Sequence, residues 1–222
     1  MLINAHCHIQ NIVPLNLNTR LYISNPLDKA QVAKHLAFQQ SNILISTGQH
    51  PYYYHNSITN QFLIDLLEEG KIWAVGEIGL DKRNPDHEGQ KKVLLEQLDI
   101  AKQFHRPIII HCVGKYYDLY NIIKHNFPHE RYIFHFFQGS LDIIKSFAPY
   151  RIIYSIHQLL MNRKKSTEIL KVILNQHDFL FETDDDVHES NDISITIQKI
   201  ALFTNHKEGE LARKQQLVFE SL

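Results

Sequence analysis

This chain of 222 residues has few cysteines, a net charge close to zero and no long hydrophobic run. Two cysteines provide no disulfide framework, which excludes a small secreted fold held by disulfides. A formal net charge of −1 gives no overall field that attracts nucleic acid, so phosphate must be recognised by local basic residues. No apolar stretch approaches the roughly 18 residues of a membrane span, and the start MLINAHCHIQ lacks the features of a signal peptide. We therefore expect a cytoplasmic protein with no membrane contact and no obligate protein partner.

Nothing along the chain marks a boundary between domains. There is no internal repeat, low-complexity tract or linker rich in proline and glycine. The hydrophobic content of 44% and the charged content of 21% are those of a globular protein. A single α/β barrel commonly has about 200–250 residues. We therefore expect residues 1–222 to form one domain.

Strand-like runs alternate with helix-like ones, which predicts parallel β/α units. Eight strands are expected, at 1–6, 20–24, 42–47, 71–77, 107–111, 131–136, 150–156 and 178–183. Helices are expected at 28–40, 59–69, 90–104, 115–126, 141–147 and 165–175, with a terminal helix or helix pair within 190–222. The count predicts a TIM-like (β/α) barrel. Residues 10–20 are too few for a full helix, so a barrel that lacks its first helix and is open or crossed by a loop there is expected.

Six residues of metal-ligand type stand at or near the ends of these strand-like runs: His6, His8, Glu77, His111, His135 and Asp184. A barrel places the C-terminal ends of its strands around one face, so these residues are expected to converge. Side chains two residues apart on a strand share a face, as His6 and His8 do. The same alternation turns Cys7 and Cys112 away from the metal, and both are expected to be buried thiols.

Each of these residues also has a purely structural explanation. A single His-x-His pair is often chance, and a lone histidine after a core strand is more often a core residue than a ligand. Glu77 lies in the apolar run AVGEIGLD, where a charge must be paired or ligated. The six together favour ligation, with Glu77 shared between two metals. Glu182 lies two residues before Asp184, so its side chain is expected on the same face of the strand but deeper in the barrel. From there it is expected to orient a ligating imidazole.

These motifs as a set resemble the TatD family of metal-dependent hydrolases, from Met1 to about Asp184. The matching segments are His6-Cys7-His8, Gly48-Gln49-His50-Pro51, Gly76 to Asp81, Gln90 and Gln97, His111, the His135–Gly139–Ser140 stretch and Glu182-Thr183-Asp184. The resemblance implies a TIM-like barrel in which His6, His8, Glu77, His111, His135 and Asp184 bind metal. It also implies hydrolysis of phosphodiester bonds in DNA.

The chain departs from the family pattern at positions around these motifs. Val113 stands where members usually carry an arginine. Asp185, Asp186 and Val187 replace an Ala-Pro-Tyr segment, and the basic segment that usually follows is replaced by residues 189–192. The ligand motifs are thus intact, whereas the positions expected to contact substrate differ.

We expect one or two divalent ions, of Zn, Mn, Mg or Fe, because a mixed set of imidazoles and carboxylates suits each of them. In the expected arrangement Glu77 lies between two ions, one held by His6, His8 and Asp184 and the other by His111 and His135. Asp184 is the expected general base. His50 is expected to hold a substrate oxygen, the alternative being a histidine fixed in a proline turn. Basic residues on the rim, Lys115 among them, are expected to receive phosphate.

The predicted function is metal-dependent hydrolysis of phosphodiester bonds in nucleic acid or in a small phosphodiester. One alternative is hydrolysis of a C–N or C–O bond in a small ester, amide or lactone, which the acidic residues 184–186 favour because they repel a polyanion. A second alternative is a catalytically silent barrel that binds metal or a partner.

Overall fold

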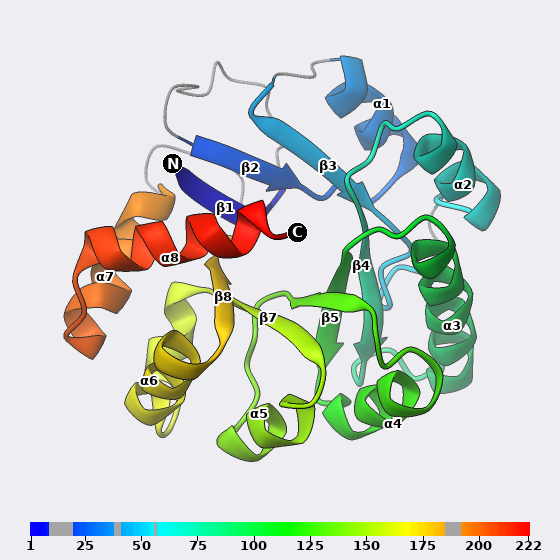
Figure 1. Cartoon of the computed structure of the whole chain (residues 1–222). Coiled ribbons are helices and arrows are strands. Elements are labelled where there is room, and N and C mark those ends of the chain that lie inside the picture. Colours follow the sequence, from blue (N-terminus) through cyan, green and yellow to red (C-terminus); the bar gives the residue numbers. More distant parts are fainter. Residues whose placement is uncertain (9–19, 38–40, 56, 185–191) are drawn as a thin grey trace.

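The predicted barrel is present in the computed structural model, which describes residues 1–8, 20–37, 41–55, 57–184 and 192–222. Its parallel strands form one sheet in the order β1 to β8, with helices around the outside, as Figure 1 shows. The fold is a TIM-like, nearly closed barrel, and the predicted fold class is confirmed. The strands are β1 Leu2–Cys7, β2 Arg20–Ser24, β3 Ile43–Thr47, β4 Ala74–Asp81, β5 Ile108–Val113, β6 Arg131–Phe134, β7 Arg151–Ile156 and β8 Asp178–Phe181.

The helices of the described residues lie near their predicted positions. They are α1 Lys29–Ala37, α2 Asn60–Glu68, α3 His87–Gln103, α4 Tyr116–Asn126, α5 Leu141–Phe147, α6 Ser166–Gln176, α7 Ile193–Thr204 and α8 Glu208–Glu220. A short 3-10 helix, η1 Gln158–Asn162, was not predicted. Helix α3 begins three residues earlier than predicted because the Asp86 carboxylate accepts a hydrogen bond from Gly89 N–H and caps it. None of these helices is long and apolar enough to cross a membrane.

The expected opening between the first two strands is not present. Strands β1 and β2 pair in parallel, with Leu2 beside Arg20 and Asn4 beside Tyr22. The segment predicted to be too short for a helix, residues 10–20, lies outside the described residues apart from Arg20.

The seam between β8 and β1 is closed mainly by one buried side chain. The Asn4 amide accepts from Thr183 N–H at 3.1 Å and donates to Thr183 Oγ1 at 2.9 Å. The backbone N–H of Asp184 then donates to the His6 carbonyl at 3.1 Å. Because these bonds join the two strand ends, they also fix the distance between two predicted ligands.

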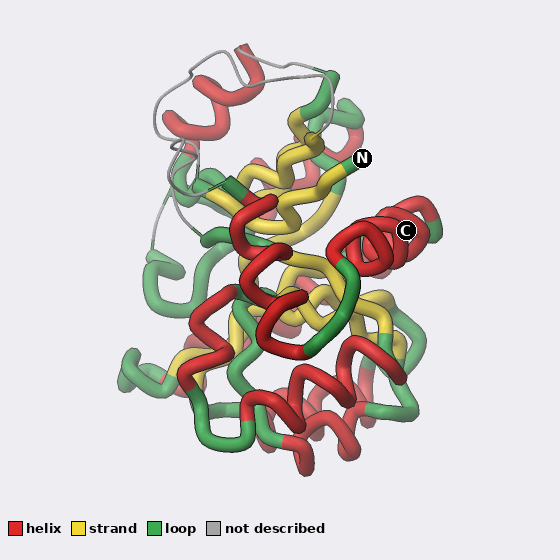
Figure 2. Tube along the Cα trace, turned by 90° about the vertical axis from the view of Figure 1, so that its left-hand side faces the viewer, coloured by secondary structure: helices red, strands yellow, loops and turns green. Residues whose placement is uncertain are grey.

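The core has two layers, one inside the barrel and one between the sheet and the helices. Buried apolar residues from seven strands fill the interior, whereas a larger cluster packs the strands against the helices. Val218 and Phe219 of α8, and Leu222 just after it, pack against the interior cluster, and the Phe219 ring stacks on Trp73 at 5.6 Å between ring centroids. Figures 1 and 2 show α8 beside the N-terminal strand. Helix α8 thus closes one end of the barrel and leaves the other end for the polar residues.

Strand β4 runs to Asp81, so the predicted end of this strand at Glu77 is wrong and Glu77 lies within it. The strand carries glycines where it approaches β5. A Cβ on Gly76 would lie 2.5 Å from the Ile109 carbonyl oxygen, and one on Gly79 would lie 1.8 Å from that of His111. Both glycines have positive φ, and the ladder shifts register between Val75 and Ile78. This irregular course holds Glu77 in the barrel interior.

Candidate metal centre

The structure brings the six predicted ligands together at the C-terminal end of the barrel. Their nitrogen and oxygen atoms, with those of His50, fall into three overlapping groups, and the atoms within each group lie within 4.8 Å of one another. The groups are His6, Glu77 and His135; His6, His8 and Asp184; and His50, Glu77 and His111. The second group is the set expected to hold one ion, whereas in the other two groups His135 lies with His6, and His50 lies with His111.

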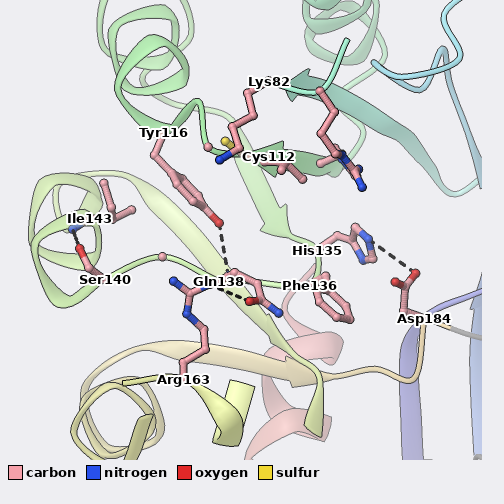
Figure 3. A pocket seen from close by; sticks show the side chains of 15 residues that line it. Lys82, Cys112, Tyr116, His135, Phe136, Gln138, Ser140, Ile143, Arg163 and Asp184 are labelled. Atoms are coloured by element: carbon pink, nitrogen blue, oxygen red, sulfur yellow. Dashed lines mark hydrogen bonds and ion pairs between the residues drawn. The ribbon is translucent and has the colours of Figure 1, made fainter. Parts of the chain in front are cut away.

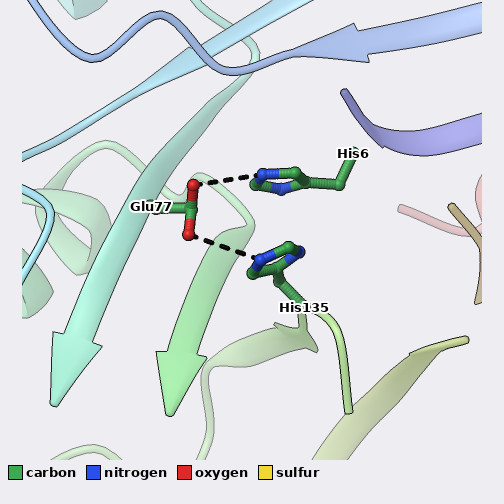
Figure 4. A group of neighbouring side chains, drawn as sticks. All are labelled: His6, Glu77 and His135. Carbon is green, nitrogen blue, oxygen red and sulfur yellow. Dashed lines mark ion pairs between the residues drawn. The ribbon is translucent and has the colours of Figure 1, made fainter. Parts of the chain in front are cut away.

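Glu77 lies at the centre of the cluster, with its two oxygens turned to different histidines (Figure 4). Oε1 is 3.1 Å from His6 Nε2 and 3.6 Å from His8 Nε2. Oε2 is 3.0 Å from His111 Nδ1 and 3.4 Å from the Nε2 atoms of both His50 and His135. A carboxylate with this arrangement has the geometry to bridge two cations.

The charge of Glu77 is maintained although the residue is only 4% exposed. Burial by itself raises the pKa of this carboxyl, but its interactions with His6 and His135 and the hydrogen bonds from His111 and His50 outweigh burial and hold the pKa well below the ordinary value. His6 is affected in the opposite way, because its burial and the charge of His135 lower its pKa. The cluster therefore contains an ionised carboxylate beside a neutral imidazole, which are the forms that bind metal.

His6 provides a direct test of whether a cation fits this site. The residue is fully buried, and neither ring nitrogen has a hydrogen-bond partner among the described residues. Nε2 lies 3.1 Å from Glu77 Oε1 and 3.6 Å from Asp184 Oδ1 without forming a hydrogen bond to either. A buried imidazole without a hydrogen bond loses its solvation with little compensation. A divalent ion between these three side chains would satisfy the nitrogen and both carboxylates.

Two histidines present Nε2 to the cluster because Nδ1 is held by an oxygen acceptor. Nδ1 of His8 lies 2.9 Å from the carbonyl oxygen of Asn25. Nδ1 of His135 lies 3.1 Å from Glu182, which is fully buried and also accepts from Phe136 N–H and from the Ser155 hydroxyl. An oxygen acceptor places the proton on Nδ1 and leaves the Nε2 lone pair free to bind a cation.

His111 is oriented by a residue that was not predicted, Asp81. Its Nε2 lies 3.0 Å from Asp81 Oδ2, so the lone pair of Nδ1 faces Glu77. Asp81 is fully buried and is also held by the Arg83 side chain on both oxygens. Burial raises the pKa of Asp81, but hydrogen bonds from His111 and Arg83 prevail and lower it. Asp81 is the last residue of the Gly76–Asp81 motif, and its place in that motif was the available signal.

His50 differs from the other histidines in the position of its proton. Nδ1 accepts a hydrogen bond from the backbone N–H of Tyr52 at 3.1 Å, so the neutral ring carries its proton on Nε2. Burial lowers the pKa of His50, which favours that neutral ring. The proton points toward Glu77 Oε2 at 3.4 Å. His50 is therefore built as a hydrogen-bond donor and not as a ligand.

Asp184 lies at the open side of the cluster. Its Oδ1 is 3.6 Å from Nε2 of both His6 and His8, and its side chain is 30% exposed. Burial raises its pKa, but the hydrogen bond to His8 and the charge of His135 lower it to about 2. Asp184 lines a cavity of about 610 Å³, whose wall also includes His111 and His135 (Figure 3).

Two expectations from the sequence are not met at this site. Lys115 is not brought to the cluster, because it pairs with Asp118 at 3.2 Å and lines a separate groove between α3 and α4. Cys112, expected to be buried, is half-buried and lines the cavity of Figure 3, although burial raises the pKa of its thiol to about 12. Cys7 is buried and faces away from the cluster as predicted.

The motif glutamines on α3 support the loops that carry this site. Gln90 accepts from Asp81 N–H at 2.7 Å and donates to the Asp81 carbonyl at 3.1 Å. Gln97 accepts from Gln49 N–H at 2.9 Å, next to His50. Both glutamines are buried. They fix the turn after β4 and the turn after β3 to the same helix.

Comparisons with known proteins agree with this geometry. Residues 4–222 match the family model described as TatD related DNase. An uncharacterised metal-dependent hydrolase of Methanocaldococcus jannaschii is 21% identical and covers 99% of the chain and 94% of its own length. The 3'-5' ssDNA/RNA exonuclease TatD of Escherichia coli is 33% identical over 43% of the chain, a match that spans 38% of that enzyme.

Solved structures share the fold. The crystal structure of YjjV, a TatD homolog of Escherichia coli, superposes with a TM-score of 0.83 at 21% identity and covers 100% of this chain and 97% of its own. A TatD family hydrolase of Entamoeba histolytica has a TM-score of 0.77 at 12% identity, with 99% and 97% covered.

Proposed function

Because the chain belongs to the TatD family of metal-dependent hydrolases, we propose that it hydrolyses phosphodiester bonds of short single-stranded nucleic acids at the six-residue cluster. The observation that carries this proposal is the position of Glu77, with one oxygen facing His6 and His8 and the other facing His111 and His135. Sites that hold two cations around one carboxylate are typical of enzymes that cleave phosphate esters.

His6, His8, Glu77, His111, His135 and Asp184 would hold one or two divalent ions, of Zn, Mn, Mg or Fe. The bound ions supply Lewis acidity, which polarises the phosphate and makes a nearby water more acidic. The remaining steps belong to side chains of the chain itself.

Asp184 is the proposed general base. It is the cluster carboxylate that lines the cavity, and its low pKa keeps it ionised at neutral pH. An ionised carboxylate at the open side takes a proton from the attacking water and passes it to solvent. Glu77, buried among histidines, has no such route to solvent and serves to hold the ions.

His50 is the proposed donor to a substrate oxygen. Tyr52 N–H fixes the ring with its proton on Nε2, beside Glu77. A neutral imidazole in this position donates a hydrogen bond to the leaving oxygen and stabilises the negative charge that develops there as the P–O bond breaks, and the leaving oxygen takes its proton from solvent water. Asp184 is thus the base, and His50 stabilises the leaving oxygen.

The rim beside His50 supports a nucleic acid substrate. Tyr52 and Tyr53 are 44% and 54% exposed, and their rings meet edge to face at 4.9 Å. The Tyr53 ring lies 5.3 Å from His50, and the Arg83 guanidinium lies over Tyr52 at 5.4 Å. Exposed aromatic rings next to a cation are the surfaces on which unpaired bases stack.

A comparison of substrates tests this proposal. The protein, stripped of metal and reloaded with Mn, Zn or Mg, is assayed with bis-p-nitrophenyl phosphate, short oligothymidylates, and a panel of lactones and amides. Metal-dependent cleavage of the phosphodiesters, lost in Asp184→Asn, is the expected result, because the amide keeps the shape but cannot take the proton. Cleavage of a lactone or amide without phosphodiester cleavage would instead identify a small-molecule amidohydrolase.

A further inference from the structure

The cavity beside the cluster has a second end that the proposed chemistry does not use. From His111, His135 and Asp184 the cavity continues to a wall formed by Lys82, Tyr116, Gln138, Ser140 and Arg163. These residues come from the turn after β4, the start of α4, the loop between β6 and α5, and the segment after η1. In Figure 3 the Lys82 ammonium, the Tyr116 hydroxyl and the Arg163 guanidinium turn toward the same space.

Two cationic side chains at this end have no carboxylate partner among the described residues. Within the described part of the chain, neither Lys82 nor Arg163 forms an ion pair. Arg83, which also lines the cavity, is different because both oxygens of Asp81 hold its guanidinium. Asp184, the carboxylate on the wall, belongs to the cluster at the other end. The second end therefore carries positive charge that an anion can neutralise.

The donors at this end are held in place by contacts with one another. Gln138 accepts from Arg163 Nη1 at 2.8 Å, which orients the guanidinium and leaves its other N–H groups unused. Gln138 N–H donates to the Tyr116 hydroxyl at 3.3 Å, so that hydroxyl keeps its own proton to donate. The Lys82 side chain crosses Gly114 so closely that a Cβ there would lie 2.4 Å from its Cδ. The absence of a side chain at Gly114 thus leaves room for the Lys82 side chain to reach the cavity.

We infer that Lys82, Tyr116 and Arg163 form a phosphate subsite for the nucleotide adjacent to the bond that is cleaved. Guanidinium and ammonium groups with a neutral hydroxyl beside them are the groups that bind phosphate in proteins. The inference rests on the proposed function, since it assigns the cleaved phosphodiester to the cluster and a second phosphate to the far end of the same cavity. The preferred substrate is therefore a short oligonucleotide with a second phosphate beside the cleaved bond, not an isolated phosphodiester.

Binding of nucleotides that contain no phosphodiester tests the phosphate subsite without turnover. Calorimetric titration of the Mn-loaded protein compares thymidine 3′,5′-bisphosphate with the 3′- and 5′-monophosphates. We expect the bisphosphate to bind about tenfold more tightly or better than either monophosphate, the gain typical of a charge-assisted contact. Arg163→Met and Lys82→Met, which keep the aliphatic stems, should each lose most of that gain. Lys164→Met is the matched control, because Lys164 is an exposed neighbour that does not line the cavity.

The outcomes separate this inference from the proposed function. A bisphosphate that binds no better than the monophosphates overturns the phosphate subsite, and so does an equal loss in Lys164→Met, which would indicate general electrostatics. Hydrolysis of bis-p-nitrophenyl phosphate by the unmodified protein is measured in parallel. If that hydrolysis is absent while the bisphosphate gain is present and is lost in Arg163→Met, the proposed function fails and the phosphate subsite stands.

Discussion

Glu182 holds Nδ1 of His135 at 3.1 Å, and the opposite nitrogen of that ring lies 3.4 Å from Glu77. Burial disfavours a charged His135, but the charges of Glu182 and Glu77 outweigh it and raise the pKa of His135 to about 10. In the absence of metal the imidazole is therefore protonated and forms ion pairs with the two carboxylates. A cation must displace that proton. Glu182 holds the ring in the same orientation in the protonated and in the metal-bound state.

Glu182→Gln should weaken metal binding by roughly 10–100-fold, the range found when a carboxylate that supports a ligating histidine is removed. The amide keeps the size of the side chain but no longer fixes the proton on Nδ1 of His135. Metal affinity is measured by competition with a chromophoric chelator, with thermal unfolding to verify the fold. Glu168→Gln, at an exposed carboxylate on α6, is the matched control. Equal affinity of Glu182→Gln and Glu168→Gln for metal would show that the contact does not support the ligand.

The positions of the candidate ligands, apart from Glu77, could be predicted from the sequence because these residues lie at or just after the ends of strands. His111 follows three consecutive isoleucines, and Asp184 follows an apolar strand with Glu182 at the same parity. In a parallel barrel such positions converge on one face, whatever the lengths and exact positions of the connecting helices. The pattern therefore predicted the fold and the membership of the cluster.

Other features of the site depend on contacts that no periodicity encodes. Asp81 orients His111 only because β4 continues past Glu77, and that extension depends on a close approach to β5 at Gly76 and Gly79. Lys115 follows β5, but the start of α4 turns it toward Asp118. The proton position on His50 depends on one backbone N–H in a turn.

His50→Ala should reduce turnover of an oligonucleotide by roughly 10²–10³-fold, the usual contribution of one hydrogen-bond donor to a developing negative charge. Metal content should stay unchanged, because Nε2 carries a proton and is not a ligand. Bis-p-nitrophenyl phosphate should lose far less activity, since p-nitrophenolate spreads its negative charge over the ring and depends less on a hydrogen-bond donor. His87→Ala, at an exposed histidine away from the cluster, is the control. Loss of metal in His50→Ala, or an equal loss of turnover with both substrates, would contradict the donor role.

Metal affinity should rise with pH through the neutral range. The raised pKa of His135 stabilises the metal-free fold fully below its ordinary value near 6.5, and this stabilisation is lost as pH rises through about 10. Each ion bound at His135 releases that proton, so affinity should increase by about tenfold per pH unit. Competition titrations with Mn at several pH values measure the slope, and His135→Asn should flatten it. Affinity that is constant between neutral and alkaline pH would contradict the prediction.

Affinity for nucleic acid should depend on the bases near the cluster and very little on the length of the strand. Tyr52 and Tyr53 provide exposed rings beside His50, and stacking of a base on an aromatic ring contributes about 1–3 kcal/mol. The paired change Tyr52→Leu and Tyr53→Leu should therefore weaken binding of a short oligothymidylate by at least about tenfold. Tyr117→Leu, at a more exposed tyrosine on α4, should not.

The length dependence follows from the charge of the chain. A protein that follows a long strand makes many phosphate contacts, and each released counterion steepens the dependence of affinity on salt. This chain has a formal net charge of −1, and Val113 on the cavity wall offers no charge to a phosphate. We therefore expect affinity to level off after a few nucleotides and to depend weakly on salt. Fluorescence anisotropy of metal-loaded Asp184→Asn protein with oligothymidylates of increasing length measures both. An affinity that climbs with length and falls steeply with salt would indicate an extended binding track instead of the compact cavity.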